Sequence, residues 1–185
     1  MEDEKIIGLY FSRSEEATVQ SALKYGSRCH ALAYNILASR EDSEECVNDT
    51  YLVAWNAIPP TRPVNLGAFL LGITRKLSIS LLRYRCADRR GRGEYALSLS
   101  ELDECIGSGD RAFEALELRE LAEEAGRFLD SLSHDDRRIF MCRYYLAEPI
   151  ARIAEKSGFS ESKIKSSLHR SRRKLKTHLE KEGLL

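Results

Sequence analysis

Helical periodicity is the feature of this sequence that most constrains its fold. Apolar residues recur at intervals of three and four along nearly the whole chain, while the alternating pattern typical of strands is almost absent. Proline and glycine interrupt the helical pattern at a few places. The sequence therefore predicts an all-α protein made of two small helical domains.

The first half of the chain predicts three helices, over residues 15–38, 39–58 and 66–87. Pro59 and Pro60 end the second helix, because proline has no amide proton and restricts the residue before it. The loop 59–65 holds three prolines and should be stiff. The inner positions that we expect for the first helix are Val19, Leu23, Cys29, Leu32, Ile36 and Leu37.

The second half contains a helix-turn-helix pattern. A helix is predicted over 149–156, a turn over 157–159 and a second helix from Ser160, with Gly158 in the left-handed turn position. Ile153 and Ala154 should face inward, and Ile164 and Leu168 should anchor the second helix. In this motif the second helix enters the major groove of duplex DNA.

Charge is distributed unevenly along a chain whose formal net charge is zero. Residues 163–176 hold seven basic residues and no acidic ones, and residues 75–92 hold seven basic residues and one acid, Asp88. Residues 96–125 hold nine acidic and two basic residues. This pattern predicts two domains, 1–93 and 113–185, joined by a flexible acidic linker over 94–112.

The basic run at 75–92 lies beside aromatic residues, namely Phe69, Tyr84 and Tyr95. Cations that follow a backbone and rings that stack on bases suit single-stranded nucleic acid. The alternative is that Phe69 belongs to the core and that the arginines form a solvated helix end. Similarly, the acidic residues Glu41, Asp42, Glu44, Glu45 and Asp49 either complement a helix dipole or meet a protein partner.

Several classes of protein are disfavoured by the sequence. The five cysteines form no C-x-x-C pair, the four histidines (30, 134, 169 and 178) look isolated, and no pattern predicts a metal site or a cofactor. No nucleophile is paired with a base, so the chain is not expected to be an enzyme. No signal peptide or membrane insertion is expected, and a cytoplasmic location follows. A stand-alone helix-turn-helix repressor or activator remains the alternative function.

Three runs of this sequence resemble the sigma-70 family of bacterial RNA polymerase sigma factors. AYNILASREDSEECVNDTYLVAWNAI is similar to regions 2.1–2.2, NLGAFLLGITRKLSISLLRYRCADRR to regions 2.3–2.4, and SLSHDDRRIFMCRYYLAEPIARIAEKSGFSESKIKSSLHRSRRKL to region 4. No region 3 fits between them, which is typical of the extracytoplasmic-function (ECF) group.

The resemblance implies a partner for each surface, and the partners are promoter DNA and core RNA polymerase, through its β′ clamp and β flap. The residues expected to bind the polymerase are Asp42, Glu44, Glu45, Asn48, Asp49, Tyr51, Leu52 and Trp55. Those expected to read and open the −10 element are Arg62, Asn65, Phe69, Arg75, Lys76, Ser80, Arg83 and Arg85. Those expected at the −35 element are Ser160, Ser162, Lys163, Lys165, Ser166, Ser167, His169, Arg170, Arg172 and Arg173.

The chain departs from the family pattern at a few of these positions. Phe69 stands where the family has Trp. A stacking ring is retained, but its stacking is weaker. The other departures are Asn48 for Gln, Lys76 for Asn, Ser80 for Asp and Ser167 for Arg. The family also implies an anti-sigma factor as a further partner.

Overall fold

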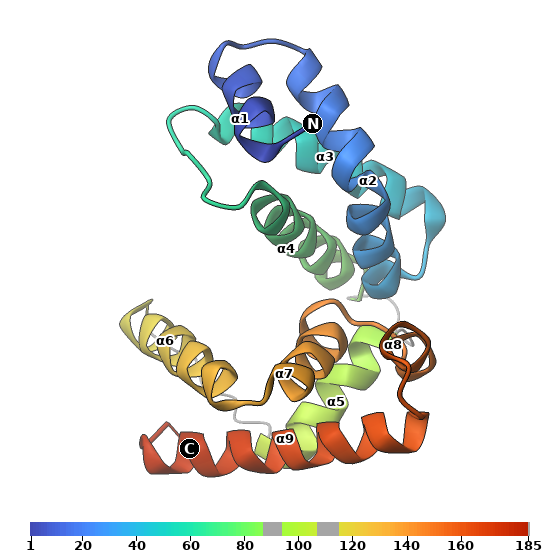
Figure 1. Ribbon diagram of the computed structural model, residues 1–185, viewed down its shortest axis with the longest axis vertical. Helices are drawn as coiled ribbons and strands as arrows, with labels where there is room; N and C mark the ends of the chain where they lie inside the picture. The colour runs from blue at the N-terminus through green and yellow to red at the C-terminus, as the bar shows by residue number, and fades with distance from the viewer. Residues whose placement is uncertain (87–93, 107–114, 185) are drawn as a thin grey trace. The chain divides into compact units, whose positions relative to one another are not determined.

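The computed structural model describes residues 1–86, 94–106 and 115–184, and all regular secondary structure within these ranges is helical (Figure 1). The expectation of an all-α protein is therefore confirmed. The chain divides into two compact units, Met1–Gly93 and Glu94–Leu185. Among the described residues, no helix combines the length and the apolar character that crossing a membrane requires.

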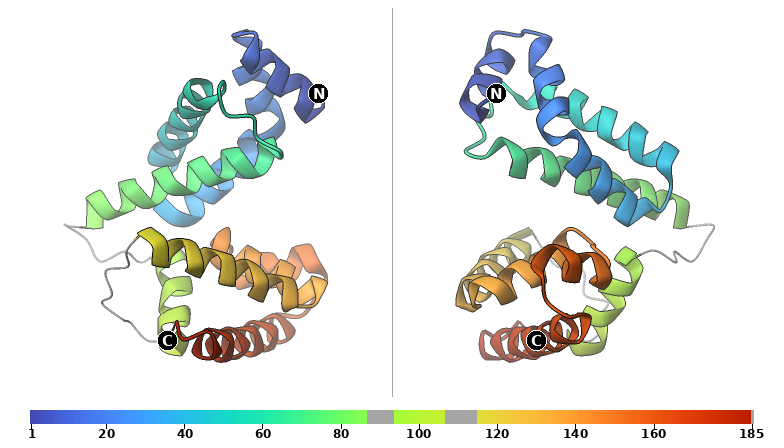
Figure 2. Two further views of the ribbon diagram at one scale, coloured as in Figure 1. Left: turned by 90° about the vertical axis from the view of Figure 1, so that its left-hand side faces the viewer. Right: turned by 45° about the vertical axis from the view of Figure 1, so that its right-hand side comes forward.

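The first unit is built from α1 (Asp3–Phe11), α2 (Glu16–Leu37), α3 (Arg40–Ala57) and α4 (Leu66–Cys86). Helices α2, α3 and α4 pack against one another, as both views of Figure 2 show. Helix α1, which the periodicity did not indicate, packs on α2. It contributes Ile6, Ile7 and Tyr10 to the core, and the Tyr10 hydroxyl lies 2.9 Å from that of Ser21.

A seam of small polar side chains joins α3 to α4. The hydroxyls of Thr50 and Thr74 lie 3.0 Å apart, and the thiol of Cys46 lies 3.2 Å from the hydroxyl of Ser78. All four residues are buried. Each hydroxyl also donates to the carbonyl four residues earlier, as Thr50 does to Cys46 at 2.8 Å, so no buried hydroxyl in the seam lacks a partner. Small side chains here allow the two helices to approach closely.

The buried stripe of α2 differs from the expected one. Cys29, Leu32 and Ile36 are buried as predicted, but Val19 is 49% exposed and Leu23 is 76% exposed. The stripe instead continues through three smaller or more polar residues, Ala17, Ser21 and Tyr25. The hydroxyls of Ser21 and Tyr25 find partners inside the unit, which removes the cost of burying them.

The second unit comprises α5 (Glu94–Ile106), α6 (Ala115–Ser131), α7 (His134–Phe140), the π-helix η1 (Met141–Tyr145), α8 (Ile150–Ser157) and α9 (Glu161–Lys181). Helix α9 contacts α5, α6, α7 and α8. The core of the second unit consists of Phe128, Leu132, Ile139, Phe140, Tyr144, Ile153, Ile164, Leu168, Leu175 and Leu179. The inward positions predicted for the helix-turn-helix are confirmed, with Ile153, Ile164 and Leu168 each at most 2% exposed.

The structure differs from the prediction in residues 94–106, which were expected to belong to the linker. They form α5, which packs on η1 and α9 and belongs to the second unit. Tyr95 and Ser98 are buried there, so Tyr95 is a core residue and not a free stacking ring. The remaining linker residues, 107–112, and the basic residues Arg89, Arg90 and Arg92 lie outside the described residues.

Gly67 provides a test of the packing between α2 and α4. A Cβ atom at this position would lie 2.7 Å from Cε1 of the buried Tyr25 ring. We expect Gly67→Ala to lower the free energy of unfolding by about 1–3 kcal/mol, because a ring held in the core cannot move aside freely. Urea unfolding followed by circular dichroism measures this change.

Gly8→Ala is the matched control for this substitution. A Cβ atom at Gly8 would meet nothing within 4 Å, and Gly8 lies inside α1. Alanine should therefore stabilise the protein there by about 0.5–1 kcal/mol. Equal effects of the two substitutions would contradict the packing described for Gly67.

Candidate nucleic-acid and polymerase interfaces

The turn between α8 and α9 has the geometry that the sequence predicts for a helix-turn-helix. Gly158 ends α8 in the left-handed conformation, with φ of 72°. The hydroxyl of Ser160 accepts a hydrogen bond from the amide of Lys163 at 3.3 Å and caps α9. The ammonium of Lys163 lies 3.3 Å from the centre of the Phe159 ring, which holds it at the start of the helix.

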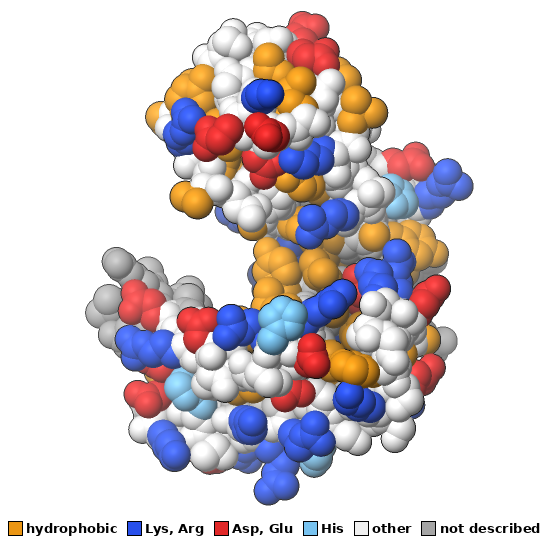
Figure 3. Space-filling view, viewed as in Figure 1, with side chains coloured by type: hydrophobic (Ala, Val, Ile, Leu, Met, Phe, Trp, Pro, Cys, Tyr) orange, Lys and Arg blue, Asp and Glu red, His pale blue; other side chains and the backbone are white. Residues whose placement is uncertain are grey.

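One face of α9 is exposed and cationic. At about 100° per residue, five exposed residues fall within roughly a quarter of the helix circumference. They are Ser162, Ser166, His169, Arg170 and Arg173. In Figure 3 the Lys and Arg side chains gather along the lower edge, over α9. We name these five residues the α9 face. They were all among the residues expected to read the −35 element.

Two other residues of that predicted set do not lie on the α9 face. Ser167 is 2% exposed and donates a hydrogen bond to the carboxylate of Asp136 in α7. This bond, with a second from Ser133 at 2.8 Å, holds the pKa of Asp136 below its ordinary value. Arg172 is paired with Glu101 and with the Tyr144 hydroxyl, so its guanidinium is turned toward α5 and η1. Both side chains are therefore engaged in contacts inside the second unit.

The remaining members of the predicted set, Ser160, Lys163 and Lys165, are exposed around the start of α9. The ammonium of Lys165 lies 3.6 Å from Glu161 one turn earlier, an exposed pair that solvent screens. A hollow of about 610 Å³ opens beside the helix and shares Arg170 and Arg173 with the α9 face. It is lined by Phe128, Ser131, Arg170, Arg173, Lys174, Thr177, His178 and Lys181. The cationic surface thus extends further along α9 than the predicted residues.

Arg143 of η1 organises the other side of the unit. Its side chain is only 3% exposed, and it lies 2.7 Å from Glu94 and 2.6 Å from Glu101, both in α5. A second bond to Glu101 at 3.4 Å makes that contact bidentate, and Nη1 also donates to the Glu148 carbonyl at 3.0 Å. A buried guanidinium needs such partners, because desolvation costs several kcal/mol. This requirement explains why the acidic segment is folded against the unit.

In the first unit, α4 presents a face that combines an aromatic ring with cations. Four residues lie within about 60° of one another around the helix, namely Phe69, Lys76, Ser80 and Arg83. Phe69 is half-buried, while the other three are exposed. We name these four residues the α4 face. Arg75 lies outside it and is half-buried, and the side chain of Arg85 is not among those that the structure describes.

The loop before α4 is fixed by polar contacts. The side chain of Asn65 accepts a hydrogen bond from the amide of Ala68 at 2.8 Å and caps α4. Arg62 lies 2.6 Å from Glu4 and over the ring of Phe11, so α1 holds it. Val64, which lies between Arg62 and Asn65 in the sequence, is fully exposed. This exposed apolar side chain in the loop before α4 was not predicted from the sequence, since a single valine in a loop has no periodic signal.

Helix α3 presents the acidic face that was expected to bind a protein. Five residues are exposed together along this helix, and we name them the α3 face: Glu44, Glu45, Asn48, Asp49 and Leu52. Asp42 is only 6% exposed at the start of the helix, where a carboxylate complements the helix dipole. Tyr51 is half-buried, and its burial raises the pKa of the phenol to about 12.

Trp55 is fixed against α1 and the segment after it. Its ring centre lies 6.2 Å from that of Tyr10, and the guanidinium of Arg13 lies 5.4 Å above it. Arg13 also donates a hydrogen bond to the Trp55 carbonyl at 2.7 Å. These contacts give Trp55 a structural role within the unit and leave it half-buried at the end of α3.

A hollow of about 310 Å³ lies between α3 and α4 and brings together residues that were assigned to different ligands. It is lined by Glu45, Cys46, Asp49, Leu77, Ser80, Leu81 and Tyr84. Glu45 and Asp49 belong to the α3 face, and Ser80 to the α4 face. The two faces therefore meet at this hollow, with the 85% exposed Tyr84 at its edge.

Comparison with known proteins gives a family for both units. Residues 22–87 match the profile described as Sigma-70 region 2, and residues 122–175 match the profile described as Sigma-70, region 4. Among solved structures, that of CnrH in complex with the cytosolic domain of CnrY is 21% identical. The match covers 96% of this chain and 97% of that chain, with a TM-score of 0.45. A search of curated proteins found no match.

The contacts of Arg143 predict what holds α5 in place. Glu101→Ala should destabilise the second unit by about 3 kcal/mol, since it removes one carboxylate partner from a buried charge and leaves Glu94. Hydrogen exchange should then become faster in α5 than in α8. Glu104→Ala removes an exposed carboxylate of the same helix and should leave exchange unchanged. Equal exchange in both variants would contradict the role given to Glu101.

Proposed function

Because the chain belongs to the sigma-70 family, with the regions 2 and 4 that the ECF group has, we propose that its α4 and α9 faces bind two different states of promoter DNA. The protein is a sigma factor, a non-enzymatic subunit that directs RNA polymerase to promoters. The α9 face would bind the −35 element as duplex. The α4 face would bind the −10 element as separated strands. The observation that supports this division is the different chemistry of the two faces.

The α9 face suits a groove. Its serines and His169 can donate and accept hydrogen bonds at base edges, and Arg170 and Arg173 can contact bases or phosphates. Neither arginine forms an ion pair with any described residue of the chain. Ser167 and Arg172, which face the interior of the unit, are not part of this proposal. The cations of the neighbouring hollow would add salt-dependent affinity for the backbone.

The α4 face suits unpaired bases. Phe69 offers a ring, and Lys76 and Arg83 offer charges on the same side of the helix. Stacking of one base on an aromatic side chain is worth about 1–3 kcal/mol, comparable with the cost of unstacking it. The exposed Val64, in the loop before α4, would offer a flipped base an apolar contact.

The α3 face would bind the β′ clamp of core polymerase. Its carboxylates suit a basic partner, and Leu52, which is 59% exposed, offers an apolar contact among them. Asp42 is left out of this surface because it is buried. The β flap is the second polymerase contact that we propose, as the resemblance to the family implies.

An anti-sigma factor is the further partner that we propose. The α3 face is the natural target, because a protein covering it would exclude the polymerase. CnrH is likewise described in complex with a protein domain, the cytosolic domain of CnrY. We also propose that this chain acts in the cytoplasm, where its polymerase and promoters are found.

Charge reversal tests the polymerase interface. Asp49→Lys should weaken capture of core polymerase at least about tenfold, because like charges then face each other across the interface. Pull-down by the full-length protein measures this loss, and run-off transcription from a promoter library measures its consequence. Glu15→Lys makes the same charge change on an exposed residue outside the α3 face and should bind normally. If wild-type protein footprints an operator but never supports run-off transcripts, a stand-alone repressor is the better description.

Two further substitutions separate strand opening from duplex binding. Phe69→Ala should reduce permanganate reactivity of unpaired thymines at the −10 element, while −35 duplex binding by the holoenzyme stays normal. Arg173→Ala should weaken duplex binding and reduce its salt slope by about one. Lys5→Ala removes an exposed cation of α1 and should change neither readout. Loss of both activities in each variant would refute the division of labour.

A further inference from the structure

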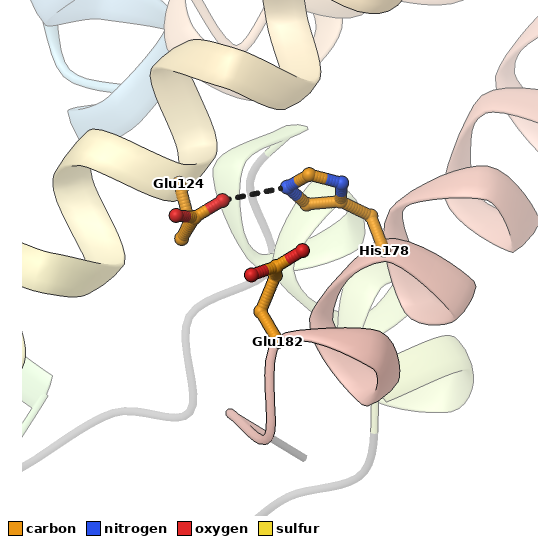
Figure 4. A group of neighbouring side chains, drawn as sticks. All are labelled: Glu124, His178 and Glu182. Carbon is orange, nitrogen blue, oxygen red and sulfur yellow. Dashed lines mark hydrogen bonds and ion pairs between the residues drawn. The ribbon is translucent and has the colours of Figure 1, made fainter.

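Three potential metal ligands converge where α6 meets the end of α9 (Figure 4). His178 lies in the last turn of α9, Glu182 directly follows that helix, and Glu124 comes from α6. Nε2 of His178 lies 3.0 Å from Oε2 of Glu124. One ligand atom from each residue lies within 4.8 Å of the other two. His178 is therefore not isolated, in contrast to its appearance in the sequence.

We propose that Glu124, His178 and Glu182 bind a divalent transition-metal ion of the Zn²⁺ type. His178 and Glu182 are four residues apart, so they share one side of the helix end and can chelate a single ion. Ligand atoms about 2.0–2.1 Å from a tetrahedral ion lie roughly 3.3 Å apart, which is close to the separation already present between His178 and Glu124. Imidazole nitrogen and carboxylate oxygen are both zinc ligands, and zinc with three protein ligands takes water in the fourth position.

The surroundings of Glu124 are those of a prepared ligand. The residue is only 8% exposed, and its other oxygen, Oε1, accepts a hydrogen bond from Arg127. Such a second bond fixes the orientation of a ligating carboxylate. The ring of Phe128 lies 6.1 Å from that of His178 and limits its movement. With both carboxylates ionised, the three ligands carry two negative charges, which the single charge of Arg127 does not cancel.

The cationic hollow is the feature that opposes a bound cation, since Lys181 and Arg173 line it together with His178. Nε2 of His178 is directed at Glu124, and the two carboxylates in direct contact with the ion would attract it at the shortest distances, where the Coulomb energy is largest. The ion would replace the proton between His178 and Glu124. It would thereby tie α6 to the helix that carries the α9 face.

The test uses full-length protein, stripped with a chelator and with its thiols blocked by iodoacetamide. Blocking is needed because the cysteines are an alternative set of ligands. Calorimetric titration with ZnCl₂ should show one equivalent bound in the presence of excess Mg²⁺. Titration with Co²⁺ should give the visible absorption of a four- or five-coordinate ion without sulfur charge-transfer bands.

Two variants and a matched control locate the ion. Glu182→Gln and His178→Gln should each weaken Zn²⁺ binding at least about tenfold, because loss of even an outer partner costs that much. Glu180→Gln makes the same change on an exposed neighbour and should bind normally. Zn²⁺ should raise the melting temperature of the wild type and the Glu180 variant but not of the Glu182 variant. Because Glu182 is exposed, that variant should fold normally.

Equal Zn²⁺ affinity in all four proteins would overturn the proposal. So would binding that disappears when the thiols are blocked, or that Mg²⁺ displaces. These measurements require neither polymerase nor DNA, so their outcome is independent of the proposed function.

Discussion

The apolar stripe of α9 is the constraint on which the DNA-binding unit depends. Ile164, Leu168, Leu175 and Leu179 are buried along one side of the helix. Each such burial is worth about 1.5–3 kcal/mol, so turning α9 by even one residue would expose these side chains and bury charges in their place. The orientation of the α9 face is therefore a consequence of core packing. No contact with DNA is needed to hold it ready.

Arg143 adds a second constraint to the same unit. A surface ion pair is worth at most about 1 kcal/mol and could not fix a helix by itself. A guanidinium that is 3% exposed is different, because without its carboxylates it would leave an unpaired charge in the core. The acidic segment before α6 thus has a structural function as α5. The same cluster also holds Arg172, which removes one cation from the surface of α9.

The sequence predicted those parts of the molecule whose signals are local. Gly158 and Ser160 give the turn between α8 and α9 because a left-handed residue and a helix cap depend only on near neighbours. The side chains of Ser167 and Arg172 are turned inward by contacts with Asp136 and Glu101, which lie 31 and 71 residues away in the chain. No periodicity reports such partners.

Composition alone gives a misleading prediction at two other places. The acidic residues of 94–106 indicated a linker, although two of them, Glu94 and Glu101, pair with Arg143. In α2, the apolar Val19 and Leu23 indicated a buried stripe that in fact runs through Ser21 and Tyr25. Both differences have one cause. A polar group can be buried once a specific partner exists, and the partner is visible only in three dimensions. The same holds for His178 and Glu124, which are 54 residues apart.

The uneven distribution of charge explains how a chain without net charge can bind a polyanion, since residues 163–176 hold seven basic residues and no acidic ones. Four carboxylates are engaged inside the second unit: Glu94 and Glu101 with Arg143, Glu148 with Lys156, and Asp136 with two serines. The charges of the three glutamates are offset by neighbouring cations and contribute little to the field at the far side of α9. Arg170 and Arg173 face solvent without a described ion-pair partner. The net charge of zero is thus the sum of surfaces of opposite sign, such as the acidic α3 face and the cationic α9 face, and only the cationic surfaces meet DNA.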